Sequence, residues 1–347
     1  MQIRKRAALA AAALSAALCL PLGASVRAQS GGDGTGLLRE AVLAYAKYSY
    51  VGQIQNTDFG SQRADSVLFR IEHRAPDMTR RWYLAPESLY GDSIISRGDT
   101  SYDIDPHTKR VIVMHDDAID DQVAMDDNFG LLLHNYRAVV GPDDNVAGRR
   151  ARSVLLVNKY TGETVMRIAV DAETKLVLEK DRYAASGSVA HQMRFENIRY
   201  TSSIPKELFM VPKTGYTRKE GPSHGIPSND LAAVVRTAGF QAIGPKYLPD
   251  GFLPVAGDVT DIKGVRTLHI LYSDGLRTIS LFENARGAAV DMSKFTVHGT
   301  KVRSNDAKYV EDGPTTLLAW ASGSRHFALV GEISRDELVR IASSVSA

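Results

Sequence analysis

The sequence predicts an α+β protein: a large half-open antiparallel β-barrel with helices at its mouth, followed by a smaller α+β domain. Between residues 48 and 200, apolar residues alternate with polar ones in short segments separated by turn residues. This period-two pattern is typical of antiparallel strands joined by short turns. Helical periodicity is confined to a few segments, so the helices are expected to pack against a sheet. A polar stretch rich in proline and glycine separates the two parts.

The first 28 residues have the organisation of a secretory signal peptide. A basic head at residues 4–6 precedes an apolar run from Ala7 to Leu22, and a small-residue site ends at Ala28. This order predicts export to the periplasm and cleavage near Ala28. The alternative is a retained membrane anchor, which the short, alanine-rich run disfavours.

Removal of the signal peptide would leave a chain without cysteine, because Cys19 is the only one. Disulfides, thiol catalysis and thiolate metal ligands would then be excluded. The segment carries four of the 42 basic residues and none of the 40 acidic ones, which leaves 38 against 40 and a net charge of −2. This balance gives no indication of a nucleic-acid partner.

Residues 29–36 read as a flexible lead, and the large domain is expected to span residues 37–212. Its first element is a helix over residues 37–48, in which Leu38 and Ala41 share one apolar face. A second helix is predicted over residues 125–140. Both helices are expected at the mouth of the barrel.

The strands of the large domain are predicted from runs in which every second residue is apolar. They are expected at residues 48–56, 66–74, 80–86, 92–105, 109–115, 153–158, 164–171, 176–183 and 189–200. Because short turns connect most of these runs, neighbouring strands are expected to pair antiparallel.

Residues 213–228 are expected to be a linker, and residues 229–347 to form the second domain. Its first helix is capped by Asn229 or Ser228 and closed by Gly239.

An Asp274-Gly275 pair stands between the alternating runs TLHILY and LRTISLF, which predicts a β-hairpin with a type I′ turn. Near the end of the chain, Ser334 and Glu337 have the spacing of a capping box before a last amphipathic helix. The second domain is therefore also α+β.

Motifs for catalysis or metal binding are missing from the sequence. The nine histidines are scattered, and no two have the i, i+4 spacing of a helical zinc site. The acidic cluster HDDAIDD at residues 115–121 lacks the glycine and the closing glutamate of a calcium loop. The stretch ASGSRH at residues 321–326 lacks the second glycine of a nucleophile elbow. We therefore expect a binding protein rather than an enzyme, with no metal and no cofactor.

The apolar face of a large sheet must be buried by other parts of the chain. If they bury it incompletely, the exposed remainder forms a groove for a lipidic ligand. Periodicity predicts that six side chains line the concave face of this groove, because within each strand they stand two positions apart. They are Phe69, Ile71, Trp82, Leu84, Met166 and Ile168. The charged Arg70 and Arg167 between them are expected to face water. The alternative is that helices fill the same face as an ordinary core.

Several stretches resemble known periplasmic proteins. RRWYLAPESLYGDSIISRGDTSYDIDPHTKRV, residues 80–111, resembles the outer-membrane lipoprotein carriers of the LolA and LolB type. NVAGRRARSVLLV, MRIAVDAETKLVLEKDRY and PKELFMVP resemble the same region of the MucB/RseB proteins. In the second domain, YLPDGFLPVAGD, VRTLHILYSDGLRTISLFEN and RHFALVGEISRDELVRIASSV resemble the MucB/RseB carboxy-terminal domain. A carrier of the LolA type has no such domain, so the resemblance favours MucB/RseB.

The resemblance implies a function. MucB/RseB proteins are periplasmic negative regulators of an envelope-stress sigma factor. They bind the periplasmic part of a single-span anti-sigma factor and shield it from proteolysis, and their large domain is thought to sense lipoprotein, lipopolysaccharide or acyl chains. The alternative function is a periplasmic lipoprotein or lipid carrier of the LolA type.

Overall fold

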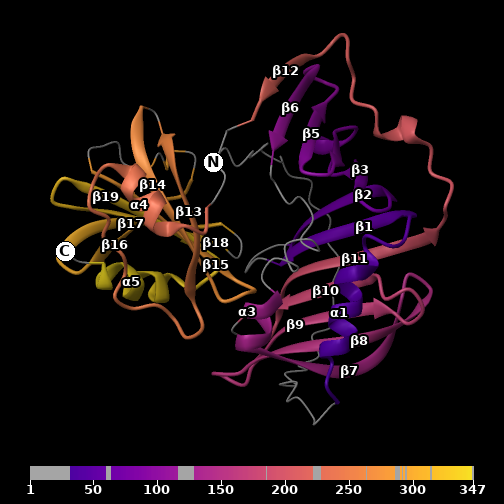
Figure 1. Ribbon diagram of the computed structural model, residues 1–347, viewed down its shortest axis with the longest axis horizontal. Helices are drawn as coiled ribbons and strands as arrows, with labels where there is room; N and C mark the ends of the chain where they lie inside the picture. Colours follow the sequence, from indigo (N-terminus) through magenta and orange to yellow (C-terminus); the bar gives the residue numbers. More distant parts are fainter. Residues whose placement is uncertain are drawn as a thin grey trace, which may run out of the picture. The chain divides into compact units, whose positions relative to one another are not determined.

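The computed structural model describes residues 32–59, 64–115, 129–184, 186–221, 228–262, 264–285, 290, 292–293, 295–312 and 315–345. The predicted signal peptide, residues 29–31 of the lead and most of the acidic cluster at 115–121 lie outside the described residues. By its internal contacts the chain divides into two compact units (Figure 1). The first unit contains residues 1–123 and 137–222, and the second contains residues 124–136 and 223–347.

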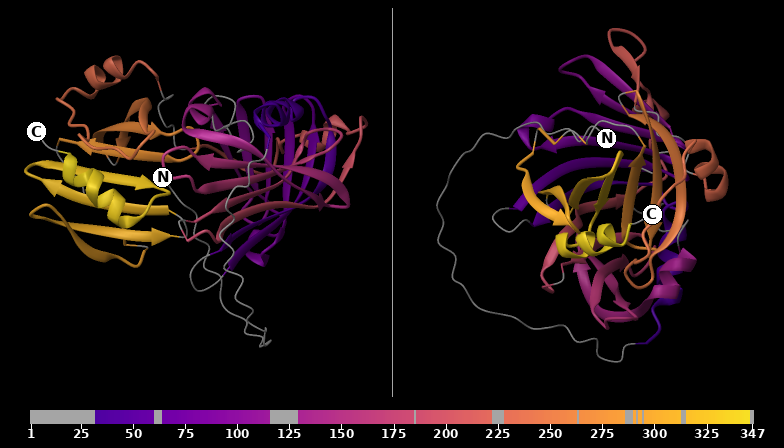
Figure 2. Two further views of the ribbon diagram at one scale, coloured as in Figure 1. Left: turned by 90° about the horizontal axis from the view of Figure 1, so that it is seen from below. Right: turned by 90° about the vertical axis from the view of Figure 1, so that its left-hand side faces the viewer.

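The first unit is built on one twelve-stranded sheet with the strand order β12-β6-β5-β4-β3-β2-β1-β11-β10-β9-β8-β7. This order ends in two different edge strands, so the sheet does not close on itself, and it is strongly curved (Figure 2). The strands are β1 (Tyr50–Phe59), β2 (Ala64–Arg74), β3 (Met78–Ala85), β4 (Ser93–Arg97), β5 (Thr100–Asp105), β6 (Arg110–His115), β7 (Tyr136–Val146), β8 (Arg149–Asn158), β9 (Thr164–Asp171), β10 (Val177–Tyr183), β11 (Val189–Tyr200) and β12 (Thr217–Glu220). The predicted half-open, mostly antiparallel architecture is confirmed.

Helix α1 (Thr35–Ala44) precedes the sheet and ends four residues before the predicted end at residue 48. Its buried side chains are Leu38, Ala41 and Ala44, which recur at three-residue spacing along one face. The chain entering α1 is tied to β7, because the Gly34 amide donates a 2.9 Å hydrogen bond to the Ala138 carbonyl. In Figure 1, α1 runs across the strands of the large sheet.

The prediction of a helix over residues 125–140 is wrong in its extent. Among the described residues, α3 covers only Phe129–Asn135, and the chain continues directly as strand β7. By its internal contacts, α3 belongs to the second unit. The apolar spacing of the leucines fits a helix, but Tyr136, Ala138 and Val139 are buried in a strand at the edge of the sheet.

Strand β12 lies inside the stretch predicted as linker. Its residues Thr217–Glu220 pair in parallel with Arg110–Val113 of β6. A polar, fully exposed segment can add a strand in this way because its backbone groups, not its side chains, make the ladder.

The second unit contains a seven-stranded sheet with the order β13-β14-β15-β19-β18-β17-β16, in which all six pairs of neighbouring strands are antiparallel. The strands are β13 (Leu253–Ile262), β14 (Val265–Ser273), β15 (Thr278–Asn284), β16 (His298–Val302), β17 (Asn305–Asp312), β18 (Thr315–Ser322) and β19 (Arg325–Gly331). Helices α4 (Leu231–Ala238) and α5 (Arg335–Ser344) pack on this sheet through Val234, Leu338 and Ile341.

The helix caps follow the predictions with two changes. Asp230, not Asn229 or Ser228, caps α4, and its side chain accepts a 3.0 Å hydrogen bond from the Ala233 amide. Gly239 ends α4 with φ +77°, a conformation that glycine adopts without steric cost. Ser334 caps α5 by accepting from the Glu337 amide, while the Glu337 carboxylate accepts from the Tyr247 hydroxyl instead.

The predicted hairpin exists, but its turn is longer than a type I′ turn. The last paired residues of β14 and β15 are Ser273 and Thr278, so four residues form the loop. Only Gly275 of the central pair has a positive φ, at +92°. The Asp274 side chain accepts hydrogen bonds from the amides of Leu276 and Arg277 at 2.9 and 2.7 Å, and this Asx-type arrangement replaces the tighter turn.

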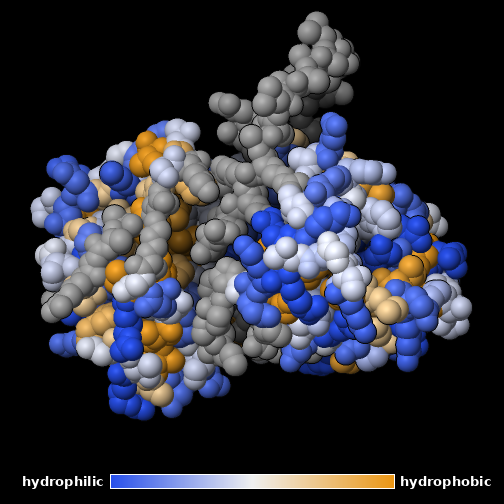
Figure 3. All heavy atoms as spheres, turned by 90° about the horizontal axis from the view of Figure 1, so that it is seen from above, coloured by the Kyte–Doolittle hydropathy of each residue, from blue (hydrophilic) through white to orange (hydrophobic). Residues whose placement is uncertain are grey.

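Both faces of the large sheet carry buried apolar side chains. On one face, Tyr50, Phe69 and Phe195 belong to the same buried cluster. On the other face, near β3 to β6, the segment around the short 3₁₀ helix η2 (Lys206–Phe209) inserts Phe209 into a second cluster. A further 3₁₀ helix, η1, covers Glu87–Leu89. The visible surface of both units is mainly hydrophilic with scattered apolar residues (Figure 3).

Candidate ligand-binding site

The face of the large sheet that carries Phe69 and Ile71 is called the inner face here. In β1, Ile54 and Gly52 lie directly opposite these two residues. Ile54 in turn lies opposite Phe195 of β11. Because opposite residues of an antiparallel pair share a face, these side chains line one continuous apolar surface.

Met166 and Ile168 lie on the same inner face. Met193, two residues from Phe195 in β11, lies opposite Lys180 of β10, and Lys180 lies opposite Ile168 of β9. Four predicted side chains are thus brought to one face. Phe69, Ile71, Met166 and Ile168 are all buried, so in this structure they are part of a packed core.

Trp82 is placed on the other face, which corrects the prediction that it lines the groove. Trp82 lies opposite Arg70, the neighbour of Phe69. Its ring is 39% exposed and lies under the Arg80 guanidinium at 4.6 Å. Leu84 is half-buried and lies at a bulge of β3, where it has no partner residue in β2, so the pairing does not assign it to a face.

Tyr83 takes the inner-face position that the prediction gave to Trp82. It lies opposite Phe69, and the two ring centroids are 5.9 Å apart. Tyr83 is half-buried. The sequence offers no clear signal for this choice, because β3 has two aromatic residues side by side after two arginines.

The residue that follows helix α1 packs on the inner face at His73. Tyr45, just after α1, packs on His73 with 4.0 Å between the tilted rings' centroids, and its hydroxyl is 2.5 Å from Thr79 Oγ1. The His73 ring bridges Thr79 Oγ1 at 3.0 Å and the Tyr45 carbonyl at 2.9 Å. This buried polar cluster fixes the end of α1 against β2 and β3.

Three half-buried apolar side chains form what we call the distal patch: Val67, Tyr83 and Met193. Val67 and Met193 both lie opposite Asn56 of β1. The Asn56 Oδ1 atom is buried and has no hydrogen-bond partner within the described part of the chain. The distal patch therefore combines apolar surface with one unsatisfied polar atom, which is a feature of ligand sites.

The outer face behind β9–β11 carries an ionic network. Arg167 donates to Glu179 at 3.2 Å and Asp181 at 2.9 Å, and Arg194 also donates to Glu179. Arg167 points away from the inner face as predicted, but its side chain is only 14% exposed. Burial raises the pKa of Glu179, and the nearby Asp181 acts in the same direction. The two arginines oppose this effect, and Arg167 also pairs with Asp144, so the network contains two arginines and three carboxylates.

No group of three or more metal-ligating side chains occurs among the residues that the structure describes. Over the same residues, no helix has the length and apolar character needed to cross a membrane. The chemistry available at the inner face is thus apolar packing and hydrogen bonding.

Two family models match the chain. Residues 63–212 match the MucB/RseB N-terminal domain, and residues 242–345 match a domain of unknown function, DUF4367. The first match falls on the large sheet, whereas the second domain is matched by a different family. No curated protein matches the chain.

Solved structures of MucB are similar to the chain over most of its length. A MucA/MucB complex of Pseudomonas aeruginosa has a TM-score of 0.62 at 14% identity, covering 90% of this chain and 97% of that chain. MucB in complex with MucA(peri) gives 0.61 at 16% identity, with 90% and 98% covered. MucB alone gives 0.50 at 13% identity, with 90% and 96% covered. Residues 63–212 therefore match the MucB/RseB N-terminal domain, and the chain as a whole shares its fold with MucB.

Proposed function

We propose that the protein is a periplasmic regulator that binds the periplasmic part of a single-span anti-sigma factor and thereby restrains an envelope-stress sigma factor. The observation that supports this most is the similarity to MucB in complex with MucA(peri), which extends over 90% of this chain and includes both units. A carrier with the large domain alone would not need the second unit. In this function the protein is a binding protein and has no enzymatic activity.

The test starts with capture. The secreted chain is expressed with a carboxy-terminal tag, the envelope is extracted, and proteins that co-purify are identified by mass spectrometry. We expect a single-span membrane protein whose cytoplasmic part binds a sigma factor. Its purified periplasmic segment should then bind the full mature chain saturably in calorimetry. If no such segment binds, the regulator function is wrong.

Localisation can be checked in the same preparation. Export predicts that the protein is released with the periplasmic fraction and that its amino terminus lies near residue 29. Retention of residues 1–28 in the mature protein would contradict this part of the proposal.

The distal patch favours a second, compatible function, the binding of an acyl chain. Half-buried Val67, Tyr83 and Met193 offer apolar contacts, and the unsatisfied Asn56 Oδ1 can accept a hydrogen bond from a hydroxyl or amide N–H in the head group of an acyl ligand. Each buried methylene would contribute about 0.8 kcal/mol. Acyl-chain binding at the distal patch would serve lipid sensing in a regulator. If no anti-sigma factor binds, it would serve a lipid carrier instead.

The acyl site is tested by titration with a fluorescent fatty-acyl probe. A Met193→Glu variant should weaken binding by at least tenfold, because a charge enters the apolar patch. Trp82→Glu is the matched control on the outer face and should bind like the wild type. Equal weakening by both variants, or no saturable binding by the wild type, would contradict an acyl site at the distal patch.

A further inference from the structure

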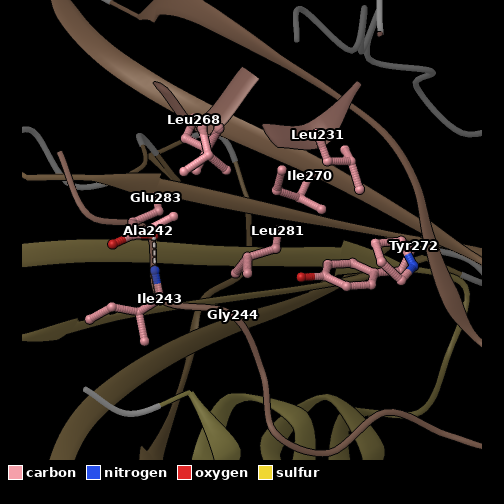
Figure 4. A pocket seen from close by; sticks show the side chains of 11 residues that line it. Leu231, Ala242, Ile243, Gly244, Leu268, Ile270, Tyr272, Leu281 and Glu283 are labelled. Carbon is pink, nitrogen blue, oxygen red and sulfur yellow. Dashed lines mark hydrogen bonds between the residues drawn. The ribbon is translucent and has the colours of Figure 1, made fainter. Parts of the chain in front are cut away.

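The second unit contains a pocket of about 190 Å³ between its sheet and the chain around α4 (Figure 4). Residues from α4, the segment after it, and strands β13 to β15 line the pocket. Its walls are mainly apolar, and the aliphatic side chains are Leu231, Val235, Ile243, Leu268, Ile270 and Leu281. None of these residues belongs to the inner face of the large sheet.

The volume of the pocket limits the ligand to about one ring. An engineered cavity of about 150 Å³ with aliphatic and aromatic walls stays dry and takes up benzene. A pocket of about 190 Å³ is therefore large enough for a six-membered ring with one substituent. A long acyl chain does not fit this volume.

Tyr272 provides a hydrogen-bonding group inside the pocket. The residue is only 6% exposed, and its hydroxyl has no hydrogen-bond partner among the residues described. In Figure 4 the hydroxyl points into the hollow between Leu281 and Gly244. Burial, with the Glu283 carboxylate nearby, raises the pKa of Tyr272 to about 12, so the hydroxyl stays protonated. Because the hydroxyl makes no hydrogen bond to the described residues, it can bond the oxygen of a ligand that enters the pocket.

Glu283 sets the charge that the pocket accepts. Its Oε2 atom accepts a 2.8 Å hydrogen bond from the Ile243 amide, and its Oε1 atom accepts from Arg325. The carboxylate is thus already compensated and needs no cation from a ligand. An anionic ligand would be repelled at short range, so a neutral ligand fits best.

We propose that this pocket binds a small neutral ring compound with one oxygen substituent, a phenol-like molecule, whose oxygen bonds the Tyr272 hydroxyl and whose ring packs against Leu231, Ile270 and Leu281. This binding site is separate from the regulator function and from the distal patch.

The experiment uses the full mature chain with phenol and toluene as probes, followed by protein NMR of the methyl groups and by calorimetry. Phenol should bind saturably in the millimolar range or tighter. Tyr272→Phe should weaken phenol binding about tenfold and leave toluene binding unchanged, because only the hydroxyl is lost. If Tyr272→Phe leaves phenol binding unchanged, or if phenol does not bind saturably, the proposal is wrong.

A second variant tests the location without disturbing the core. A Cβ atom at Gly244 would have only the Tyr272 hydroxyl within 4 Å, at 3.8 Å, so Gly244→Leu should fill the pocket and abolish binding of both probes. Gly299→Leu is the matched control, because a Cβ atom there would meet nothing within 4 Å and Gly299 lies outside the pocket. Unchanged binding in Gly244→Leu, or equal loss in Gly299→Leu, would overturn the assignment to this pocket.

Discussion

The Tyr136 hydroxyl donates a 2.6 Å hydrogen bond to Asp274 Oδ2, across 138 positions of the chain. Beside it, the Asn135 side chain donates to the carbonyls of Gly251 and Asp274 at 3.0 and 2.9 Å. All four residues belong to the second unit. The segment around α3 therefore holds the loop of the β14–β15 hairpin, although the sequence places it between two strands of the large sheet. Burial raises the pKa of Tyr136, so the donor keeps its proton at any physiological pH.

Replacement of Tyr136 by phenylalanine removes this buried hydrogen bond and leaves the Asp274 carboxylate with fewer donors. We expect Tyr136→Phe to lower the free energy of unfolding by about 2 kcal/mol, measured by urea denaturation of the mature chain. Tyr90→Phe is the control, because Tyr90 is 58% exposed, and it should change stability by less than about 0.5 kcal/mol. Equal losses of stability in Tyr136→Phe and Tyr90→Phe would show that the hydrogen bond between Tyr136 and Asp274 does not stabilise the fold.

Gly275 of the same loop has no space for a side chain. Its φ of +92° disfavours other residues, and a Cβ atom would collide with the backbone of Leu132 in α3. Gly275→Ala should therefore displace α3 and destabilise the protein by about 3 kcal/mol. Gly264→Ala measures the cost of the positive φ without a collision, because Gly264 has φ +79° and open space around it. We expect this variant to lose about 1 kcal/mol of stability. Similar losses in both variants would contradict close packing of α3 against the loop.

Asp171 at the end of β9 predicts a pH dependence of stability. Burial acts to raise its pKa, but hydrogen bonds from Arg149, the Glu173 amide and Tyr200 outweigh burial and hold the pKa below its ordinary value of 3.8. A carboxylate with a lowered folded-state pKa stabilises the fold above its unfolded pKa, and this contribution is lost as the pH falls through the folded-state value.

We expect Asp171→Asn to cost about 3 kcal/mol at pH 7, and the difference from the wild type should shrink as the pH falls below about 4. Denaturation curves at several pH values measure this. Asp143→Asn is the control, because its ion pair with Arg150 is exposed on both sides and contributes less than about 1 kcal/mol. A difference that stays constant between pH 7 and pH 2 would rule out the titration of Asp171 as its cause.

The assignment of faces in β2 and β3 predicts unequal effects of two aromatic truncations. Phe69→Ala should cost about 4 kcal/mol, because Phe69 is buried on the inner face. Trp82→Ala should cost less than about 1.5 kcal/mol, because the indole is partly exposed and packs mainly on Arg80. Thermal or urea unfolding measures both. A larger loss for Trp82→Ala would contradict the register that places it on the outer face.

The sequence alone determined the fold class and most strand positions. Alternation marked Phe69 and Ile71 as one face because the charged Arg70 stands between them, and the same holds for Met166 and Ile168 around Arg167. Such patterns are informative because a one-residue shift would bury a charge. The caps at Gly239 and Ser334 were equally local, since their hydrogen bonds lie within a few residues.

Tertiary structure alone decided the rest. Trp82 and Tyr83 are both compatible with either face, and only the pairing of Tyr83 with Phe69 chose between them. The end of α3 at Asn135 depends on β7 pairing in the large sheet and on contacts to Asp274. The pocket around Tyr272 brings together residues from positions 231 to 283. These features rest on contacts between residues distant in the chain, whose energies a local pattern does not contain.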